Sequence, residues 1–189
     1  MRRLRLRSVC TIEPGLTGAE SERIEREFGF EFAADHRAFL AAGLPVNAGR
    51  RPPPPGVIEA YAEPWPDWRH GDPDRLRGAL DRPREGVLFD VEKNGFWYDA
   101  WGPRPDRTAD AVATATAKLR DVPTLVPVHG HRYLPAGRSL TGHPVLSVWQ
   151  TDIIFYGVDL ADYIDHEFGG ATAPGAEPVA TVDFWRDLV

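Results

Sequence analysis

Apolar side chains recur at helical spacing in several segments of the chain. Ile24 and Phe28 lie four positions apart, behind a Thr-Gly-Ala-Glu sequence at 17–20 that is typical of a capping box. Asp72 or Asp74 could cap a short helix that ends near Leu80. The remaining periodicity predicts further helices over 34–42, 106–119 and 159–168.

Other segments carry short apolar runs bounded by turn residues, which is typical of strands. The run at 87–91 is followed by Asn94-Gly95 and by aromatic residues, which predicts a hairpin over 86–97. Further strands are predicted over 124–128, 132–134, 145–149 and 153–156. The last two carry consecutive apolar residues, including Leu146 and Ile154, and we expect both in the middle of the sheet. Helices interspersed with strands indicate an α+β fold with a largely antiparallel sheet.

Two segments lack either pattern. Residues 47–56 include four consecutive prolines, which favour a polyproline loop over a helix or a central strand. Residues 170–189 are predicted to form a flexible C-terminal tail, beginning with small residues. Its last part carries Phe184, Trp185 and Leu188, which would let residues 183–189 dock back onto the domain.

Length and composition agree with one folded domain over residues 1–189. A chain of this length that is 42% hydrophobic and 26% charged needs no disulfide, and Cys10 is its single cysteine. No run of apolar residues is long enough to span a membrane. No apolar segment follows Arg2 and Arg3, so we expect no export signal and a cytoplasmic location.

Charge narrows the choice of partners. The chain has a net charge of −6, and without the four arginines of its first nine residues it has 18 basic against 28 acidic residues. An acidic body disfavours direct binding of nucleic acid, which needs a basic surface. It favours a basic partner protein, while plain solubility is the simpler interpretation.

Candidates for catalysis are few. His129, His131 and His143 with Asp152 could supply a metal site, but their spacing fits no known metal motif. A hydrogen-bonded His131 with partly exposed His129 and His143 is the better explanation. No Gly-x-Ser-x-Gly sequence or glycine-rich phosphate loop is present. We therefore expect a non-enzyme without cofactor or metal. The alternative is a small-molecule binding protein or hydrolase that uses the region of His131 and Asp152.

Aromatic residues are the stronger candidates for binding. Trp65 and Trp68 occupy a proline-rich turn, where exposed rings would point to a partner. Other candidates lie in or beside the predicted strands, where core packing is the competing explanation. Together with Asp152, the predicted binding residues are Trp65, Trp68, Trp97, Trp101, His131 and Tyr133.

With these residues in place, the chain resembles the SUKH superfamily of fungal cell-wall regulators and bacterial toxin-immunity proteins. In the first half, Asp35, Phe39 and Leu40 match the family pattern after a capped helix. Three other positions there depart from it, namely Phe32, Ala33 and His36. The similarity covers residues 17–168 and is more specific in the second half. There it rests on the segments 125–128, 131–135, 142–148, 151–157 and 159–164.

The resemblance implies a twisted, largely antiparallel sheet with helices packed against it, no cofactor and usually no catalysis. Members of the family are thought to be binding scaffolds, and many neutralise toxins by covering them. The resulting hypothesis is a SUKH-like, immunity-like inhibitor of a basic partner protein such as a toxin. A regulatory scaffold without a toxin is the further alternative.

Overall fold

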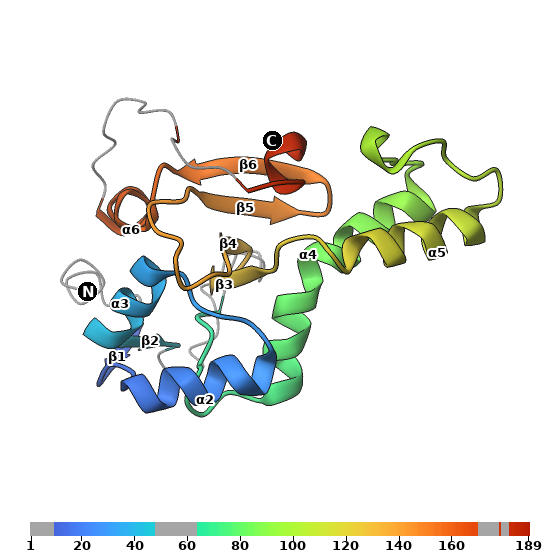
Figure 1. The fold of residues 1–189 in the computed structure, drawn as a ribbon. Helices are drawn as coiled ribbons and strands as arrows, with labels where there is room; N and C mark the ends of the chain where they lie inside the picture. Colours follow the sequence, from blue (N-terminus) through green and yellow to red (C-terminus); the bar gives the residue numbers. More distant parts are fainter. Residues whose placement is uncertain (1–9, 48–63, 170–177, 179–181) are drawn as a thin grey trace, which may run out of the picture.

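The computed structural model describes residues 10–47, 64–169, 178 and 182–189. Within them the fold is α+β, as predicted, with five α-helices and two antiparallel sheets (Figure 1). The predicted loop over 47–56 lies outside the described residues from 48 onward, as do residues 170–177 of the predicted tail. None of the described helices is long and apolar enough to cross a membrane.

The N-terminal part forms a small layer of two helices and two strands. Strand β1 (Thr11–Glu13) pairs with β2 (Leu44–Val46), and the helices α2 (Gly18–Phe28) and α3 (Ala34–Ala42) lie between them in the chain. Both predicted helices are confirmed. The capping box of α2 forms as expected, because the Thr17 side chain accepts from the Glu20 amide and the Glu20 carboxylate accepts from the Thr17 amide.

Helix α4 (Pro73–Lys93) corrects two predictions. Asp72 caps it as expected, but the helix continues far beyond Leu80 and occupies most of the predicted hairpin. Asn94 is the residue that ends the helix, and Gly95 follows with a φ of 73°. The two residues thus end a helix instead of turning a hairpin.

The second half of α4 pairs with helix α5 (Thr108–Leu119), which confirms the predicted helix over 106–119. The small side chains of Ala111 and Ala115 lie fully buried against Val91, which lets the two helices approach closely. In Figure 1 this helical pair projects to one side of the sheet. The short 3₁₀ helix η2 (Asp99–Trp101) lies in the connection between them.

A four-stranded antiparallel sheet in the order β3-β4-β5-β6 forms the centre of the molecule. Its strands confirm the predicted ones and span Leu125–His129, Arg132–Pro135, Val145–Trp149 and Asp152–Gly157. The expected central place of the last two is half wrong. Leu146 on β5 is buried as expected. Strand β6, however, lies at the edge of the sheet, where a strand has a neighbouring strand on one side only, and its Ile154 is 49% exposed.

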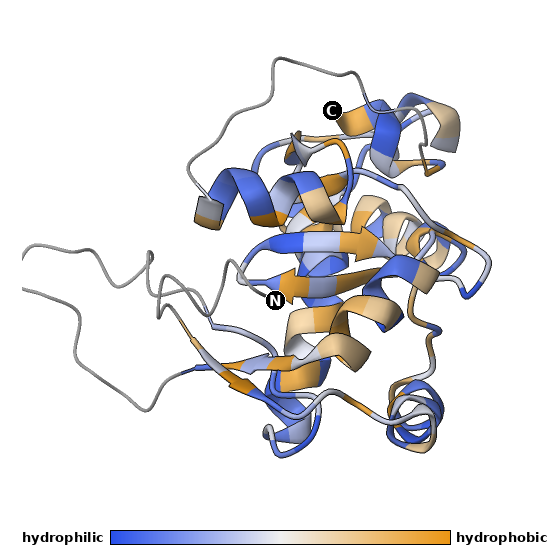
Figure 2. Cartoon of the chain, turned by 90° about the vertical axis from the view of Figure 1, so that its left-hand side faces the viewer, coloured by the Kyte–Doolittle hydropathy of each residue, from blue (hydrophilic) through white to orange (hydrophobic). Residues whose placement is uncertain are grey.

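The two faces of the sheet are covered by different elements. Helix α6 (Leu160–Gly169), capped by Asp159 as predicted, buries Tyr163 and Ile164 on one face. Helix α4 and the 3₁₀ helix η3 (Trp185–Leu188) lie on the other face. Figure 2 shows hydrophilic and hydrophobic residues alternating along the helices that cover the strands.

The C-terminal end is not a free tail within the described residues. Phe184 and Trp185 are both buried, and the Trp185 indole donates to the carbonyl of Pro123 at 2.7 Å. The expected docking of residues 183–189 is therefore confirmed. The part of the predicted tail that contains them is a packed element.

Candidate functional site

The turn between β5 and β6 presents the most exposed large hydrophobic side chain of the described residues. Trp149 ends β5 with 62% of its surface exposed and pairs with Asp152, which begins β6. Between them Gln150 adopts a φ of 57°, a conformation that non-glycine residues seldom adopt. Such local strain persists only where the surrounding structure holds it in place.

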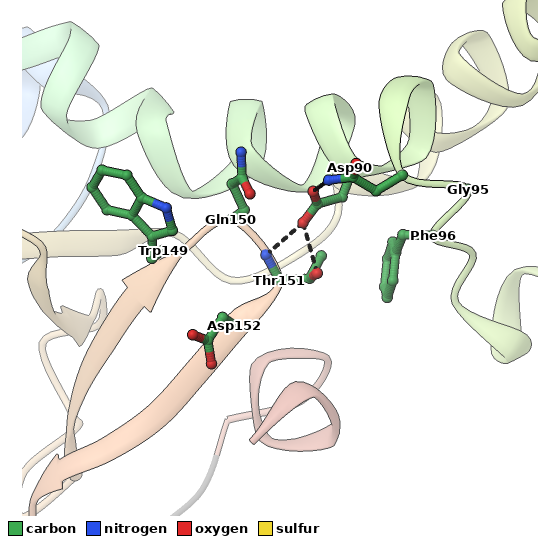
Figure 3. A pocket seen from close by; sticks show the side chains of 8 residues that line it. Asp90, Gly95, Phe96, Trp149, Gln150, Thr151 and Asp152 are labelled. Atoms are coloured by element: carbon green, nitrogen blue, oxygen red, sulfur yellow. Dashed lines mark hydrogen bonds between the residues drawn. The ribbon is translucent and has the colours of Figure 1, made fainter.

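A buried carboxylate supplies that support. Asp90 of α4 accepts hydrogen bonds from the Thr151 amide at 2.9 Å and the Thr151 hydroxyl at 2.7 Å (Figure 3). Its other oxygen accepts from the Asn94 side chain. Hydrogen bonds to a buried charge are strong and directional, so the turn is fixed to the helix.

Close packing also holds this turn against helix α4. Gly86, one turn before Asp90 on α4, faces the backbone of Gln150 so closely that a Cβ atom there would lie 2.8 Å from the Gln150 Cα. Only glycine permits this approach. The strained turn thus rests on a helix through a hydrogen-bonded pair and a direct backbone contact.

A hollow of about 550 Å³ opens beside this turn. One wall is the turn itself and the other is the C-terminal end of α4 with the residues that follow it, as Figure 3 shows. Its lining consists of Asp90, Asn94, Gly95, Phe96, Trp149, Gln150, Thr151 and Asp152. Because the Asp90 carboxylate is already bonded to the protein, Asp152 is the exposed carboxylate of the hollow.

The strand register adds a neighbouring apolar side chain. Trp149 pairs with Asp152, and Ile154 follows Asp152 by two positions, so all three lie on one face of the sheet. His131 packs edge-on against the Trp149 ring, with 6.2 Å between ring centroids. We call Trp149, Asp152 and Ile154, together with the hollow, the turn surface.

The structure corrects the expectation for Trp65 and Trp68, whose rings are buried. Trp68 packs against the rings of Phe28, Phe30 and Phe32. Trp65 packs against other rings, including that of His129 at 4.4 Å. The proline-flanked segment therefore holds both indoles inward, where each removes a large apolar area from water.

The other predicted binding residues divide between core and surface. Tyr133 is fully buried, with its hydroxyl donating to the Ala79 carbonyl. Trp97 and Trp101 are half-buried and pack edge to face, and Trp101 also meets Phe96 edge to face, which joins this pair to the hollow. Of the predicted residues, Asp152 lines the hollow, while His131 contacts its lining through Trp149 and Trp101 through Phe96. Trp97 contacts Trp101, and Tyr133 lies in the core.

The candidates for chemistry lie apart. His129 bonds to the Tyr163 hydroxyl at 3.0 Å, and His143 is buried, which lowers its pKa. Among the described residues no group of three or more histidine, cysteine or acidic side chains is placed to hold a metal ion. Burial raises the pKa of the Cys10 thiol to about 11, so the reactive thiolate is disfavoured.

Sequence reasoning did not select the residues that organise the turn surface. Trp149 belongs to the aromatic residues near the predicted strands, but its exposure follows from its place beside a strained turn. Asp90 and Gly86 fall within the wrongly predicted hairpin. A helical reading of 73–93 would have placed them one turn apart on one face and marked Asp90 as a buried carboxylate in need of donors.

Comparisons with known proteins found no matching family model, no matching curated protein and no matching solved structure. The SUKH resemblance stays a prediction based on the motifs in the sequence. The function is therefore argued from the turn surface and the charge of the chain.

Proposed function

We propose that this chain is a non-enzymatic binding protein that inhibits a basic partner protein, in the manner of an immunity protein, through the turn surface. It would act in the cytoplasm, where the partner would otherwise do harm. The observation that carries the proposal is Trp149, a tryptophan left 62% exposed on a turn that the fold holds rigidly.

A rigid exposed tryptophan supports binding for an energetic reason. Tryptophan is enriched among the few interface residues that supply most of the binding energy. Here the ring is held by His131 and by a turn fixed to α4, so association orders little that is not already ordered. The neighbouring hollow offers a concave site for a partner side chain.

Charge supports a basic partner. From Asp152 to the C-terminus the chain has eight acidic residues and one basic residue, Arg186. Asp152 is an exposed carboxylate directly across the turn from Trp149. An arginine or lysine of the partner could pack on the indole and pair with the carboxylate at the same time.

A binding experiment tests this function. Tagged wild-type chain and the Trp149→Ala variant are expressed in the native cell, and the proteins retained by each are identified by mass spectrometry. The partner is then purified and its affinity measured by calorimetry. We expect Trp149→Ala to weaken binding by at least about tenfold. Phe89→Ala is the control, because Phe89 is also exposed but does not line the hollow.

Growth separates an inhibitor from a regulatory scaffold. Expressed alone, the partner should arrest growth of a host cell, and co-expression of the wild-type chain should restore it. The Trp149→Ala, Asp152→Ala double variant should fail to restore growth. A partner that binds this variant as tightly as the wild type, or one without any effect on growth, contradicts the proposal.

A further inference from the structure

Strand β6 leaves its outer backbone groups unpaired within the described part of the chain. The Val148 amide donates to the His131 carbonyl on the β4 side, so Val148 and its β6 partner Ile153 form a non-hydrogen-bonded pair. Pairs alternate along an antiparallel ladder. The N–H and C=O groups of Ile153 and Phe155 therefore point away from β5, and those of Ile154 point toward it.

Two features that protect edge strands, proline and lysine, are missing from β6, and its one irregularity lies beyond Phe155, since Phe155 pairs with Leu146 and Gly157 with Val145. The opposite edge of the sheet, β3, carries Pro127 and an irregularity between Pro127 and His129, both of which hinder pairing. Strand β6 has no proline, lysine or bulge over Asp152–Phe155. In Figure 1 it forms the outer margin of the sheet.

Apolar side chains flank the open edge on both faces. Ile154 lies on the face of Trp149, and Phe155, which is 36% exposed, lies on the face of η3. An added strand would cover both side chains. The edge therefore offers hydrogen bonds along its backbone and apolar contact on either side.

Carboxylates surround the same strand. Asp152 begins it, Glu167 of α6 accepts from the hydroxyl of Tyr156 on β6, and Asp187 belongs to η3, which contacts β6. Two cations lie nearby within the described residues, and both already have partners. Arg186 pairs with Asp183 and Asp187, and the Arg132 guanidinium packs over the Tyr156 ring at 3.8 Å and donates to the Ser147 hydroxyl. Such a setting favours a cationic segment and disfavours a second copy of this acidic chain.

We propose that the edge of β6 takes up an extended, lysine- or arginine-bearing segment of the partner as a fifth strand of the sheet. The inference rests on the proposed function and adds the way in which the partner is held. The added strand would pair with Ile153 and Phe155, and its side chains on one face would lie beside Ile154 and Trp149.

A synthetic probe tests this without the natural partner. The probe is a short capped peptide of alternating lysine and valine. The first control is a glutamate–valine peptide, which reverses the charge. The second is the lysine–valine peptide N-methylated at its central residues, which keeps the charge but has no amide donors at those residues. Calorimetry should show each control binding at least about tenfold more weakly than the probe.

Amide hydrogen exchange gives the position of the probe. In the free protein the Ile153 and Phe155 amides should exchange fast and the Ile154 amide slowly. The lysine–valine peptide should slow exchange at Ile153 and Phe155 only. A bound peptide that leaves both amides unprotected overturns the inference, as does equal binding of the N-methylated peptide.

A pair of variants tests the edge from the side of the protein. Phe155→Pro removes an outward N–H without removing a bond to β5, and Phe155→Ala removes the same ring but keeps the N–H. We expect the proline variant to bind the peptide at least about tenfold more weakly than the alanine variant. If both melt at the same temperature and bind equally, the edge is not used.

The two proposals fail in different ways. A natural partner that depends on Trp149 but binds Phe155→Pro and Phe155→Ala equally supports the proposed function and overturns the strand addition. In the opposite case, the peptide protects the Ile153 amide, but the natural partner binds Trp149→Ala as tightly as the wild type. This result supports the strand addition and overturns the proposed role of the turn surface. Dimerisation of the wild-type chain that Phe155→Pro abolishes would assign the edge to a second copy and overturn the basic segment.

Discussion

His36 and Asp90 are both buried polar side chains, but they differ in their hydrogen bonds. Asp90 accepts three hydrogen bonds and holds the turn surface in place. His36 is fully buried beside the Phe32 ring, and within the described residues neither of its ring nitrogens has a hydrogen-bond partner. Burial penalises the charged imidazolium and lowers the pKa of His36 to about 3.

This depressed pKa predicts an acid-sensitive fold. Because the pKa of His36 is about 3 when folded and about 6.5 when unfolded, protonation favours the unfolded chain. The associated stability is complete above about pH 6.5 and is lost as the pH falls toward 3. Between pH 7.5 and pH 5 the wild type should lose about 2 kcal/mol more unfolding free energy than His36→Leu.

Urea unfolding at the two pH values measures this difference. His70→Leu is the control, because His70 is an exposed histidine on the same chain. An equal loss of unfolding free energy in the wild type and in His36→Leu would contradict the assignment of the acid sensitivity to His36.

The sequence predicts a side chain's role best where its contacts lie close to it in the chain. Asp72 and Asp159 cap helices as the sequence indicates, because capping involves residues only two or three positions away. Trp65 and Trp68 were expected on the surface and are buried, because their neighbours come from distant segments. Trp68 meets Phe28, some forty positions earlier in the chain.

At the scale of elements, Pro83 costs helix α4 one backbone hydrogen bond, and the Tyr133 side chain compensates for it. Pro83 lies inside the helix and has no N–H to donate to the carbonyl of Ala79, four residues earlier. The hydroxyl of Tyr133 on β4 donates to that carbonyl instead, at 3.1 Å. In Figure 1 the axis of α4 changes direction part-way along, as a proline in a helix commonly causes.

This compensation predicts a coupling between Tyr133 and Pro83. Tyr133→Phe should lower the unfolding free energy by about 1–3 kcal/mol, because the partly buried carbonyl of Ala79 loses its donor. In a Pro83→Ala background the new backbone N–H supplies a donor, so the same substitution should cost less. A double-mutant cycle in urea measures the coupling, and additive effects would contradict it.

Two glycines of α4 give an internal comparison. Apart from the neighbouring backbone of its own helix, Gly78 has no atom within 4 Å of where a Cβ would lie, so Gly78→Ala should stabilise the helix by about 0.5–1 kcal/mol. Gly86→Ala places its methyl group 2.8 Å from the Gln150 Cα and should destabilise the protein by about 1–3 kcal/mol. Thermal unfolding of both variants checks the sign, and stabilisation by Gly86→Ala would show that the turn does not rest on the helix.

The same helix explains the largest error in the elements predicted from sequence. Leu76, Leu80, Val87 and Val91 recur at helical spacing, but Pro83 interrupts the pattern and Asn94-Gly95 is a strong hairpin signal. Local signals could not decide between the two. Packing decides, because Val87 and Val91 are fully buried only when α4 meets both the sheet and α5. The strands at 125–157, where local pattern and packing agree, were predicted correctly.

At the scale of the whole molecule, the turn surface and the β6 edge adjoin each other, and both include residues of the acidic segment from Asp152 to the C-terminus. Trp149 and the hollow lie at one end of β6, and the open backbone groups of Ile153 and Phe155 continue from there. The fold covers the other parts of this sheet with α4, α6 and η3. A partner could therefore contact the turn and the edge in one continuous interface.

The distribution of charge predicts how such a partner associates. Charges on the surface attract over about 10 Å at 0.1 M salt and over shorter distances in more salt. Raising the salt concentration should therefore slow the association of a basic partner about tenfold or more, while its dissociation changes little. Stopped-flow mixing at several salt concentrations measures both rates.

Single neutralisations show which carboxylates provide the attraction. Asp152→Asn, beside the proposed interface, should slow association and flatten its salt dependence, because steering acts through charges close to the contact. Asp74→Asn is the matched control, since Asp74 is highly exposed at the start of α4, at the far end of that helix from the turn surface. It removes the same charge from the molecule and should leave the association rate nearly unchanged. Equal slowing by both substitutions would mean that the net charge of the chain, and not the carboxylates around β6, steers the partner.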